Sequence, residues 1–126
     1  MSWNTYVDSN LIATKNVTKA AIFRSDGQIL AKSGGFNILN SEAKAAAAAF
    51  NKKDDAYAHG LIIGKRKYLV VIVEPGLIIG STHEEGFFIY KTKENFIISF
   101  YGDRMTAAKC RLTTGRLADY FLSQGI

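Results

Sequence analysis

The stretch from residue 60 to residue 101 limits the possible folds more than any other part of the sequence. It consists of short apolar segments separated by turns of only a few residues. Turns this short leave no room for the crossover helices that parallel strands need, so consecutive strands are predicted to pair antiparallel. The predicted strands are 60–63, 68–73, 77–79, 87–91 and 96–101.

Two further strands are predicted near the N-terminus, at 18–24 and 28–33. The residues between them include Asp26 and Gly27, and an Asp-Gly pair is a strong signal for a hairpin turn. The strand at 68–73 differs from the others, because its central residues do not alternate between apolar and polar. Such a run predicts a strand that is covered on both faces.

Helices are predicted at both ends of the chain and in its middle. In the N-terminal helix Ser2 is the expected cap, and in the C-terminal helix it is Thr106. The middle helix contains the five alanines at 45–49, with Asn40 or Ser41 as its cap, because alanine is the strongest helix former. The residues at helical spacing are Trp3, Tyr6, Val7 and Leu11 at one end, and Cys110, Thr113, Leu117, Tyr120 and Phe121 at the other.

The fold class expected from these segments is α+β, with a central antiparallel sheet of about six to seven strands and helices on both faces. A chain of 126 residues with 48% hydrophobic and 21% charged residues fits one globular domain, here 1–126. Its single cysteine, Cys110, excludes an internal disulfide. The start of the sequence lacks the charged and apolar leader of a secretory signal, so a cytoplasmic location is expected. The net charge of +5 favours acidic partners.

Several motifs, taken in order along the chain, resemble the profilin family in its shorter, non-vertebrate form. The resemblance runs from end to end, and it implies that the two terminal helices pack together on one face of the sheet, with one or two shorter helices on the other. The motifs are SWNTYVD at 2–8, AAI at 20–22, DG at 26–27, the hairpin at 60–68, EPG at 74–76, RLADY at 116–120 and SQG at 123–125.

The resemblance implies an aromatic groove between the terminal helices that binds polyproline. The matching positions are Trp3, Tyr6 and Tyr120, with Leu30 where the family usually has a tryptophan. A proline-rich segment has no backbone donors, so its carbonyls suit the indole N–H and phenol O–H groups, while its rings suit aromatic faces. We expect Leu30 to lower the affinity. From spacing alone, Trp3 and Tyr6 can also simply bury a helix against the sheet.

The resemblance also implies binding of monomeric actin at a second surface, formed by the start of the last helix and neighbouring strands. By this resemblance, the protein would hold actin monomers and regulate polymerisation, and proline-rich actin-assembly proteins would recruit it. A monomer without cofactors is expected. The positions carried over are Tyr57, His59, Lys67, Val70, Arg104, Met105, Lys109 and Arg111.

One departure from the family affects the expected partners. Many relatives have paired lysines and a glycine after the position of Gly80, where this chain has STHEEG at 81–86. This change weakens the expectation of phosphoinositide binding, which remains possible at Lys65, Arg66 and Lys67. It also keeps open an alternative, in which a profilin-like scaffold binds proline-rich proteins and binds actin weakly or not at all.

Two other classes of function fit the sequence poorly. An enzyme is disfavoured because His59, His83 and Cys110 lack the spacing of metal ligands, and because the glycine-lysine turn at 64–67 lacks the rest of a phosphate loop. The adjacent acidic pairs at 54–55 and 84–85 are expected in solvated loops. Nucleic-acid binding is disfavoured because the strands lack the glycine-aromatic signature of RNA-binding sheets.

Overall fold

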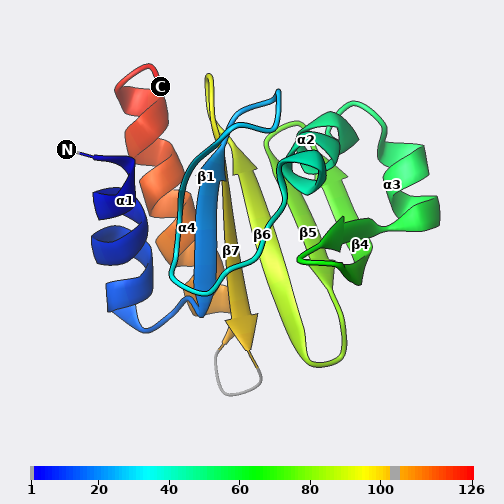
Figure 1. Cartoon of the computed structure of the whole chain (residues 1–126), viewed down its shortest axis with the longest axis horizontal. Helices are drawn as coiled ribbons and strands as arrows, with labels where there is room; N and C mark the ends of the chain where they lie inside the picture. Colours follow the sequence, from blue (N-terminus) through cyan, green and yellow to red (C-terminus); the bar gives the residue numbers. More distant parts are fainter. Residues whose placement is uncertain (1, 103–105) are drawn as a thin grey trace.

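The computed structural model describes residues 2–102 and 106–126, and it confirms the expected α+β fold. Within these residues, seven strands form one antiparallel sheet between two layers of helices (Figure 1). The strands are β1 (Lys19–Phe23), β2 (Ile29–Lys32), β3 (Leu61–Ile63), β4 (Arg66–Glu74), β5 (Leu77–Ser81), β6 (Glu85–Lys91) and β7 (Phe96–Gly102). The helices are α1 (Trp3–Thr5), which continues through η1 (Tyr6–Leu11) and η2 (Ile12–Thr14), then α2 (Asn40–Ala49), α3 (Lys53–His59) and α4 (Ala107–Ser123).

The strand order is β2-β1-β7-β6-β5-β4-β3, so the last five strands form the predicted meander. The N-terminal hairpin joins the sheet beside the last strand, where Lys19 pairs with Phe100 and Phe23 pairs with Phe96. Its turn contains Gly27 at a φ of 91°, and a side chain there would overlap the backbone oxygen of Asn40. The Asp-Gly signal in the sequence therefore marks both the turn and a close approach to α2.

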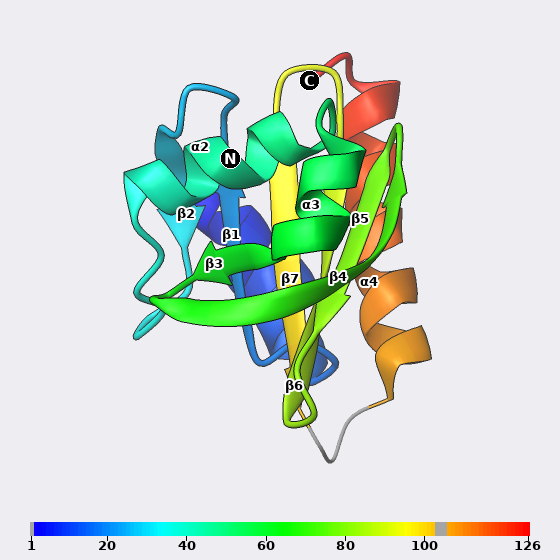
Figure 2. The same cartoon turned by 90° about the vertical axis from the view of Figure 1, so that its right-hand side faces the viewer.

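The two faces of the sheet are covered by different helices. The segment from α1 to η2 lies beside α4 on one face, and α2 and α3 lie on the other (Figures 1 and 2). Successive residues of a strand point to opposite faces. Ile22 and Ile97 are therefore buried under the terminal helices, whereas Phe23 and Phe96 are buried on the side of α2.

Two of the three predicted helix N-caps are confirmed. The Ser2 hydroxyl accepts a hydrogen bond from the backbone N–H of Thr5, and the Thr106 hydroxyl accepts one from Lys109, as expected. The prediction of Asn40 or Ser41 as the cap of α2 was wrong, because α2 begins at Asn40 and is preceded by Leu39. No helix in residues 2–102 and 106–126 is both long and apolar enough to cross a bilayer.

A buried carboxylate ties α2 to the turn between β3 and β4. Glu42 is only 8% exposed, and its carboxylate accepts three backbone hydrogen bonds. The donors are the N–H groups of Leu39 at 2.9 Å, Gly64 at 2.8 Å and Lys65 at 2.8 Å. This carboxylate thus satisfies the start of a helix and a tight turn together.

Three further local predictions were wrong. Asp54 and Asp55 lie in the first turn of α3 rather than in a loop. In the other acidic pair, Glu85 is the first residue of β6 and is partly buried, rather than lying in a solvated loop. Strand β4 was expected to be covered on both faces, but the side chains of Leu69 and Val71 are 69% and 55% exposed. One face of β4 is therefore open, and it forms part of the second surface described below.

Candidate functional site

Three aromatic rings lie together on the outside of the terminal helices. The ring centroids of Trp3 and Tyr6 are 6.1 Å apart, and those of Tyr6 and Tyr120 are 6.2 Å apart. All three side chains retain exposed surface, and Tyr120 is 45% exposed. The structure therefore brings the predicted residues Trp3, Tyr6 and Tyr120 into one aromatic strip rather than burying or scattering them.

The strip rests on a buried aromatic residue of α4. The ring of Phe121 is fully buried. Its centroid lies 5.8 Å from the ring centroid of Trp3 and 5.0 Å from that of Tyr6, with an edge-to-face arrangement in both pairs. Val7 and Leu11, on the inner side of the N-terminal helix, are also fully buried. These inner residues pack the two helices against the sheet, so the helices that carry the strip are held in place.

Leu30, the fourth predicted groove residue, lies on β2 and is partly buried. It packs against the apolar cluster beneath the terminal helices, which also includes Trp3 and Tyr6 as partly buried members. Its side chain extends the apolar base next to the strip. It supplies no ring and no hydrogen-bond donor to this surface.

The chemistry of the strip is that of a hydrogen-bond donor with apolar faces. Desolvation at the helix interface, followed by the neighbouring Tyr120, raises the pKa of Tyr6. Tyr6 therefore keeps its proton at neutral pH. The indole N–H and the two phenol O–H groups can donate to acceptors of a ligand, while the rings cover its apolar parts.

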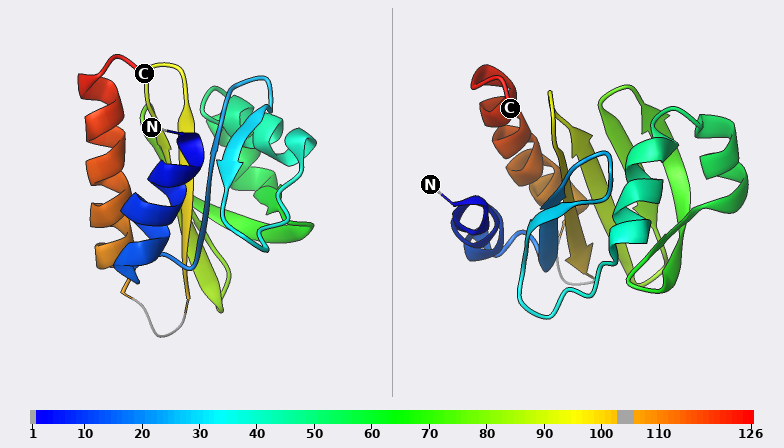
Figure 3. Two further views of the ribbon diagram at one scale, coloured as in Figure 1. Left: turned by 60° about the vertical axis from the view of Figure 1, so that its left-hand side comes forward. Right: turned by 45° about the horizontal axis from the view of Figure 1, so that its top comes forward.

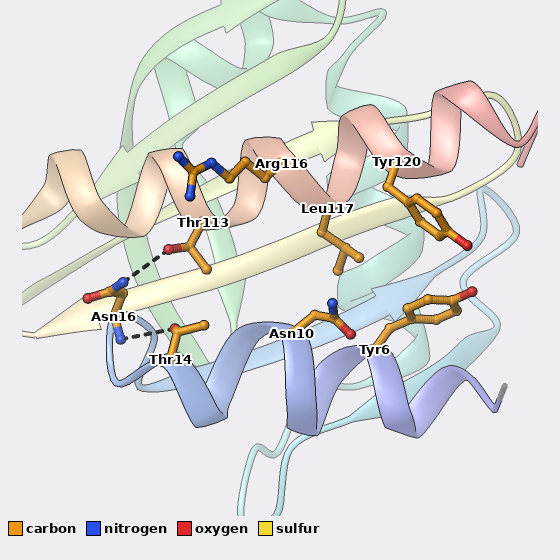
Figure 4. Close-up of a pocket in the computed structure, with 8 residues that line it drawn as sticks. All are labelled: Tyr6, Asn10, Thr14, Asn16, Thr113, Arg116, Leu117 and Tyr120. Carbon is orange, nitrogen blue, oxygen red and sulfur yellow. Dashed lines mark hydrogen bonds between the residues drawn. The ribbon is translucent and has the colours of Figure 1, made fainter.

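The groove continues from the strip along both helices (Figure 4). It encloses about 520 Å³. At its far end the Asn16 amide donates a hydrogen bond to the Thr113 hydroxyl at 3.1 Å. Asn10 and Arg116 lie between this bond and the tyrosines, and the sequence analysis did not single them out as site residues. Their spacing of four residues from Tyr6 and from Tyr120 was the signal that could have found them.

The second surface lies across α4 from the groove, on the part of the sheet that no described helix covers. Its exposed side chains on β3 and β4 include Ile62, Lys67, Leu69 and Val71. Where α4 meets β6, another cavity is lined by Tyr90, Arg111, Leu112 and Arg116, among others. Arg116 lines the groove as well, so α4 is a wall of both surfaces.

The structure separates the residues predicted to contact actin into three groups. Tyr57, His59, Lys67, Lys109 and Arg111 have exposed side chains. Val70 is only 8% exposed and belongs to the core, so its side chain points into the protein. Arg104 and Met105 lie outside the described residues. Leu69 and Val71, which flank Val70, are the exposed apolar residues of this strand, and the sequence analysis missed them because the whole run is apolar.

Tyr57 and His59 come from α3, next to the edge of β4. The Tyr57 hydroxyl accepts a hydrogen bond from the backbone N–H of Val73 at 2.8 Å. Strand β3 pairs only with the first residues of β4, so it does not reach Val73. The Tyr57 hydroxyl is the acceptor for this backbone N–H. The imidazole of His59 lies 3.7 Å from the Asp55 carboxylate, and both side chains are exposed. Tyr57 therefore holds α3 against β4 and also presents an exposed ring.

The acidic pair at 84–85 forms ion pairs with the basic residues near it. Glu84 lies 2.9 Å from Arg66, while Glu85 lies 3.2 Å from Lys19 and 3.6 Å from Arg66. Glu85 also accepts a hydrogen bond from the Tyr68 hydroxyl. Burial alone would raise the pKa of Glu85, but the hydrogen bonds from Tyr68 and Lys19, with the charges of Lys19 and Arg66, lower it overall. Arg66 is consequently engaged within the protein.

The remaining reactive groups show no arrangement for catalysis in the part of the chain that the structure describes. Burial raises the pKa of the Cys110 thiol to about 11, so it stays protonated at neutral pH. Residues 2–102 and 106–126 contain no group of three histidine, cysteine or acidic residues placed to hold a metal ion.

Comparison with known proteins gives similarity over the whole chain. A family model described as Profilin matches residues 1–126. Profilin-3 of Caenorhabditis elegans is 46% identical over 123 residues, covering 98% of this chain and 98% of the relative. The profilin of Branchiostoma belcheri is 34% identical over 126 residues, covering 100% of both chains. The sequence similarity is therefore not confined to the terminal helices.

Solved structures agree with this similarity. Profilin IA of Acanthamoeba castellanii superposes with a TM-score of 0.96 at 32% identity, covering 99% of this chain and 100% of that chain. The crystal structure of human profilin II has a TM-score of 0.78 at 17% identity, covering 97% of this chain and 99% of that chain. At the lower identity only the fold is comparable, and that fold includes the paired terminal helices shown in Figure 3.

Proposed function

This chain belongs to the profilin family, whose members are non-enzymatic actin-binding proteins, and we propose that it binds monomeric actin and, at a separate groove, proline-rich segments of actin-assembly proteins. Through these two activities it would regulate actin polymerisation in the cytoplasm. The observation that carries the proposal is the aromatic strip of Trp3, Tyr6 and Tyr120, in which three rings meet on the outer side of paired helices.

The strip suits a polyproline ligand in shape and in chemistry. Polyproline forms an extended helix without internal hydrogen bonds, and its carbonyls are free to accept. The strip presents three donors and three partly exposed rings. The rings rest on Phe121, so little conformational freedom is lost when a ligand binds.

The fluorescence of Trp3 tests this proposal directly, because Trp3 is the only tryptophan in the chain. Titration with decaproline should change the emission saturably. Tyr120→Ala should weaken binding about 30-fold, the effect of losing an anchor that contributes about 2 kcal/mol. Leu122→Ala is the matched control, because Leu122 is an exposed apolar residue on the same helix that does not line the groove. An emission spectrum that decaproline leaves unchanged would contradict the proposal.

For actin, the open face of β4 and the start of α4 support the proposed contact surface. Leu69 and Val71 supply exposed apolar area, and Lys67, Lys109 and Arg111 supply positive charge around it. An apolar centre with a basic rim suits an acidic protein face, where the charges speed encounter and fix the register. In this proposal Leu69 and Val71 take the contact role that the sequence analysis gave to Val70.

Pyrene-labelled actin under polymerising conditions tests the actin proposal. The protein should lengthen the lag before spontaneous polymerisation in proportion to its concentration. The alternative function is a profilin-like scaffold that binds proline-rich proteins with weak or no actin binding. The ion pairs of Glu84 and Glu85 favour this alternative, because they occupy basic groups near the surface. An unchanged polymerisation curve combined with normal decaproline binding would select it.

Weak phosphoinositide binding is the third part of the proposal. Lys65 and Lys67 are exposed on the β3–β4 hairpin, but Arg66 between them is paired with Glu84 and Glu85. Glu84→Gln should therefore increase binding to phosphatidylcholine vesicles that contain phosphatidylinositol bisphosphate. Vesicles of phosphatidylcholine alone are the control. Equal binding by the variant and the original protein would show that Glu84 does not limit lipid binding.

A further inference from the structure

The groove between the terminal helices has a polar end that the proposed contacts with proline do not use. Tyr6 and Tyr120 lie at its aromatic end, and Asn16 and Thr113 close the other end (Figure 4). In Figure 4 the Arg116 side chain runs along the outer side of α4 toward the end with Thr113, rather than down into the space between the helices. A ligand that lies on the tyrosines and continues along the groove therefore meets polar side chains instead of aromatic rings.

Among the described residues that line the groove, Arg116 is the only charged one. Its side chain is exposed, and it forms no ion pair with any residue in 2–102 or 106–126. Asp119, three residues further along α4, lines the cavity on the other side of the helix, and Arg116 lines that cavity as well. Because an exposed side chain changes rotamer rapidly, the guanidinium can turn toward a carboxylate that enters the groove.

The spacing of the two ends matches a short peptide. Arg116 and Tyr120 are four residues apart on α4, which corresponds to about 6 Å along the helix axis. A polyproline helix advances about 3.1 Å per residue. When prolines lie on the tyrosines, a residue about two positions beyond them reaches the level of Arg116.

We propose that the groove favours proline-rich ligands with a carboxylate flanking the prolines, and that Arg116 binds this carboxylate. This inference rests on the proposed polyproline function and names its preferred ligand. The Asn10 amide lies one helical turn beyond Tyr6, where it can donate to the same carboxylate or to the adjacent backbone carbonyl. Arg116 thus acts as a specificity residue, while the aromatic strip supplies most of the affinity.

The test compares peptides on the intact protein by Trp3 fluorescence at low salt. The reference is decaproline with both ends blocked. The other blocked peptides carry two glutamates or two lysines after the prolines or before them, and a further decaproline keeps its free C-terminal carboxylate. Glutamates at one of the two ends should improve affinity about three- to fivefold, as expected for an accessible ion pair. Lysines should not, and high salt should remove the gain. The peptide with a free C-terminus shows whether a terminal carboxylate serves as well as a side chain.

Two variants assign the effect to Arg116. In Arg116→Gln the acidic peptide and plain decaproline should bind with equal affinity. In Arg116→Lys most of the preference for the acidic peptide should remain. Lys53→Gln is the control for net charge, because Lys53 lies on α3 across the sheet from the groove. Circular dichroism confirms that each variant is folded.

Equal affinities for acidic and plain peptides, or a preference that persists in Arg116→Gln, would overturn the inference while leaving polyproline binding intact. If plain decaproline does not bind at all, the proposed function itself fails. The two failures are therefore distinguishable in one set of titrations.

Discussion

At the scale of single residues, neighbouring positions of β4 have opposite environments. Val70 belongs to the core on the side of α2 and α3, whereas Leu69 and Val71 point outward. Strand β4 also has an irregular register with β5 between Val70 and Ile72. The same type of side chain is therefore part of the core at one position and exposed apolar surface at the next.

Alanine substitutions at these two positions should separate the two roles. Val70→Ala should lower the free energy of unfolding by about 2 kcal/mol, because it removes two buried methyl groups and leaves a cavity. Leu69→Ala should change the free energy of unfolding by less than about 0.5 kcal/mol. It should also shorten the lag that the protein imposes on actin polymerisation. Urea denaturation and pyrene-actin assays measure the two effects. If Val70→Ala kept its stability but no longer delayed actin polymerisation, the result would contradict the orientation of this strand.

The residue scale also shows what the sequence could and could not predict. The three ring positions of the groove were predicted from the family resemblance, because their helical spacing alone fits simple burial of a helix equally well. The orientation of Val70 was not, because five consecutive apolar residues give no alternation from which a face can be assigned. Arg116 was quoted only as part of a family motif, since one arginine on a helix is ordinary until the groove beside it is known.

At the scale of elements, the hydrogen bonds of Glu42 join parts of the chain that no sequence pattern links. Its carboxylate receives N–H groups from the start of α2 and from the turn between β3 and β4. In that turn Lys65 adopts a φ of 63°, a conformation that side chains other than glycine rarely take. The carboxylate therefore stabilises a turn whose backbone is unfavourable in isolation.

Replacement of Glu42 by alanine should destabilise the protein by about 3 kcal/mol, because three N–H groups lose a charged acceptor. The midpoint of urea denaturation measures the change. Glu74→Ala is the matched control, since Glu74 is an exposed glutamate at the end of β4, and its loss should have little effect. Similar midpoints for the two variants would show that water replaces the Glu42 carboxylate at little cost.

The elements themselves were predicted with unequal success. The terminal helices and the meander have strong signals, namely helical spacing with caps and short turns between apolar runs. Helix α3 has only one buried residue, Ala56, so it shows no apolar periodicity from which a helix could be inferred. Its place depends on contacts such as the bond between Tyr57 and Val73, which only the folded chain provides.

At the scale of the whole molecule, Glu85 makes stability depend on pH. Its pKa is lower in the folded protein than its ordinary value of about 4.3. A lowered folded pKa means that the unfolded chain binds the proton more readily. The stabilisation is therefore complete above about pH 5 and is lost as the pH falls through the ordinary value toward the folded one.

Glu85→Gln should accordingly be less stable than the original protein by about 2 kcal/mol at pH 7, and this difference should shrink by pH 3. Thermal unfolding at pH 7, 5 and 3 measures it. Glu94→Gln, which changes a glutamate that is exposed in the β6–β7 turn, controls for general charge effects. A difference that stays constant with pH would mean that Glu85 contributes by packing rather than by charge.

Helix α4 forms a wall of both surfaces, with Thr113, Arg116 and Tyr120 along the groove and Arg111 and Leu112 toward the open sheet. If actin shifts this helix, it changes the affinity for proline-rich ligands, and those ligands must change the affinity for actin by the same factor, because the coupling free energy between two binding equilibria is reciprocal. Under the proposed function, the two binding events would then be coupled through the helix that both surfaces share.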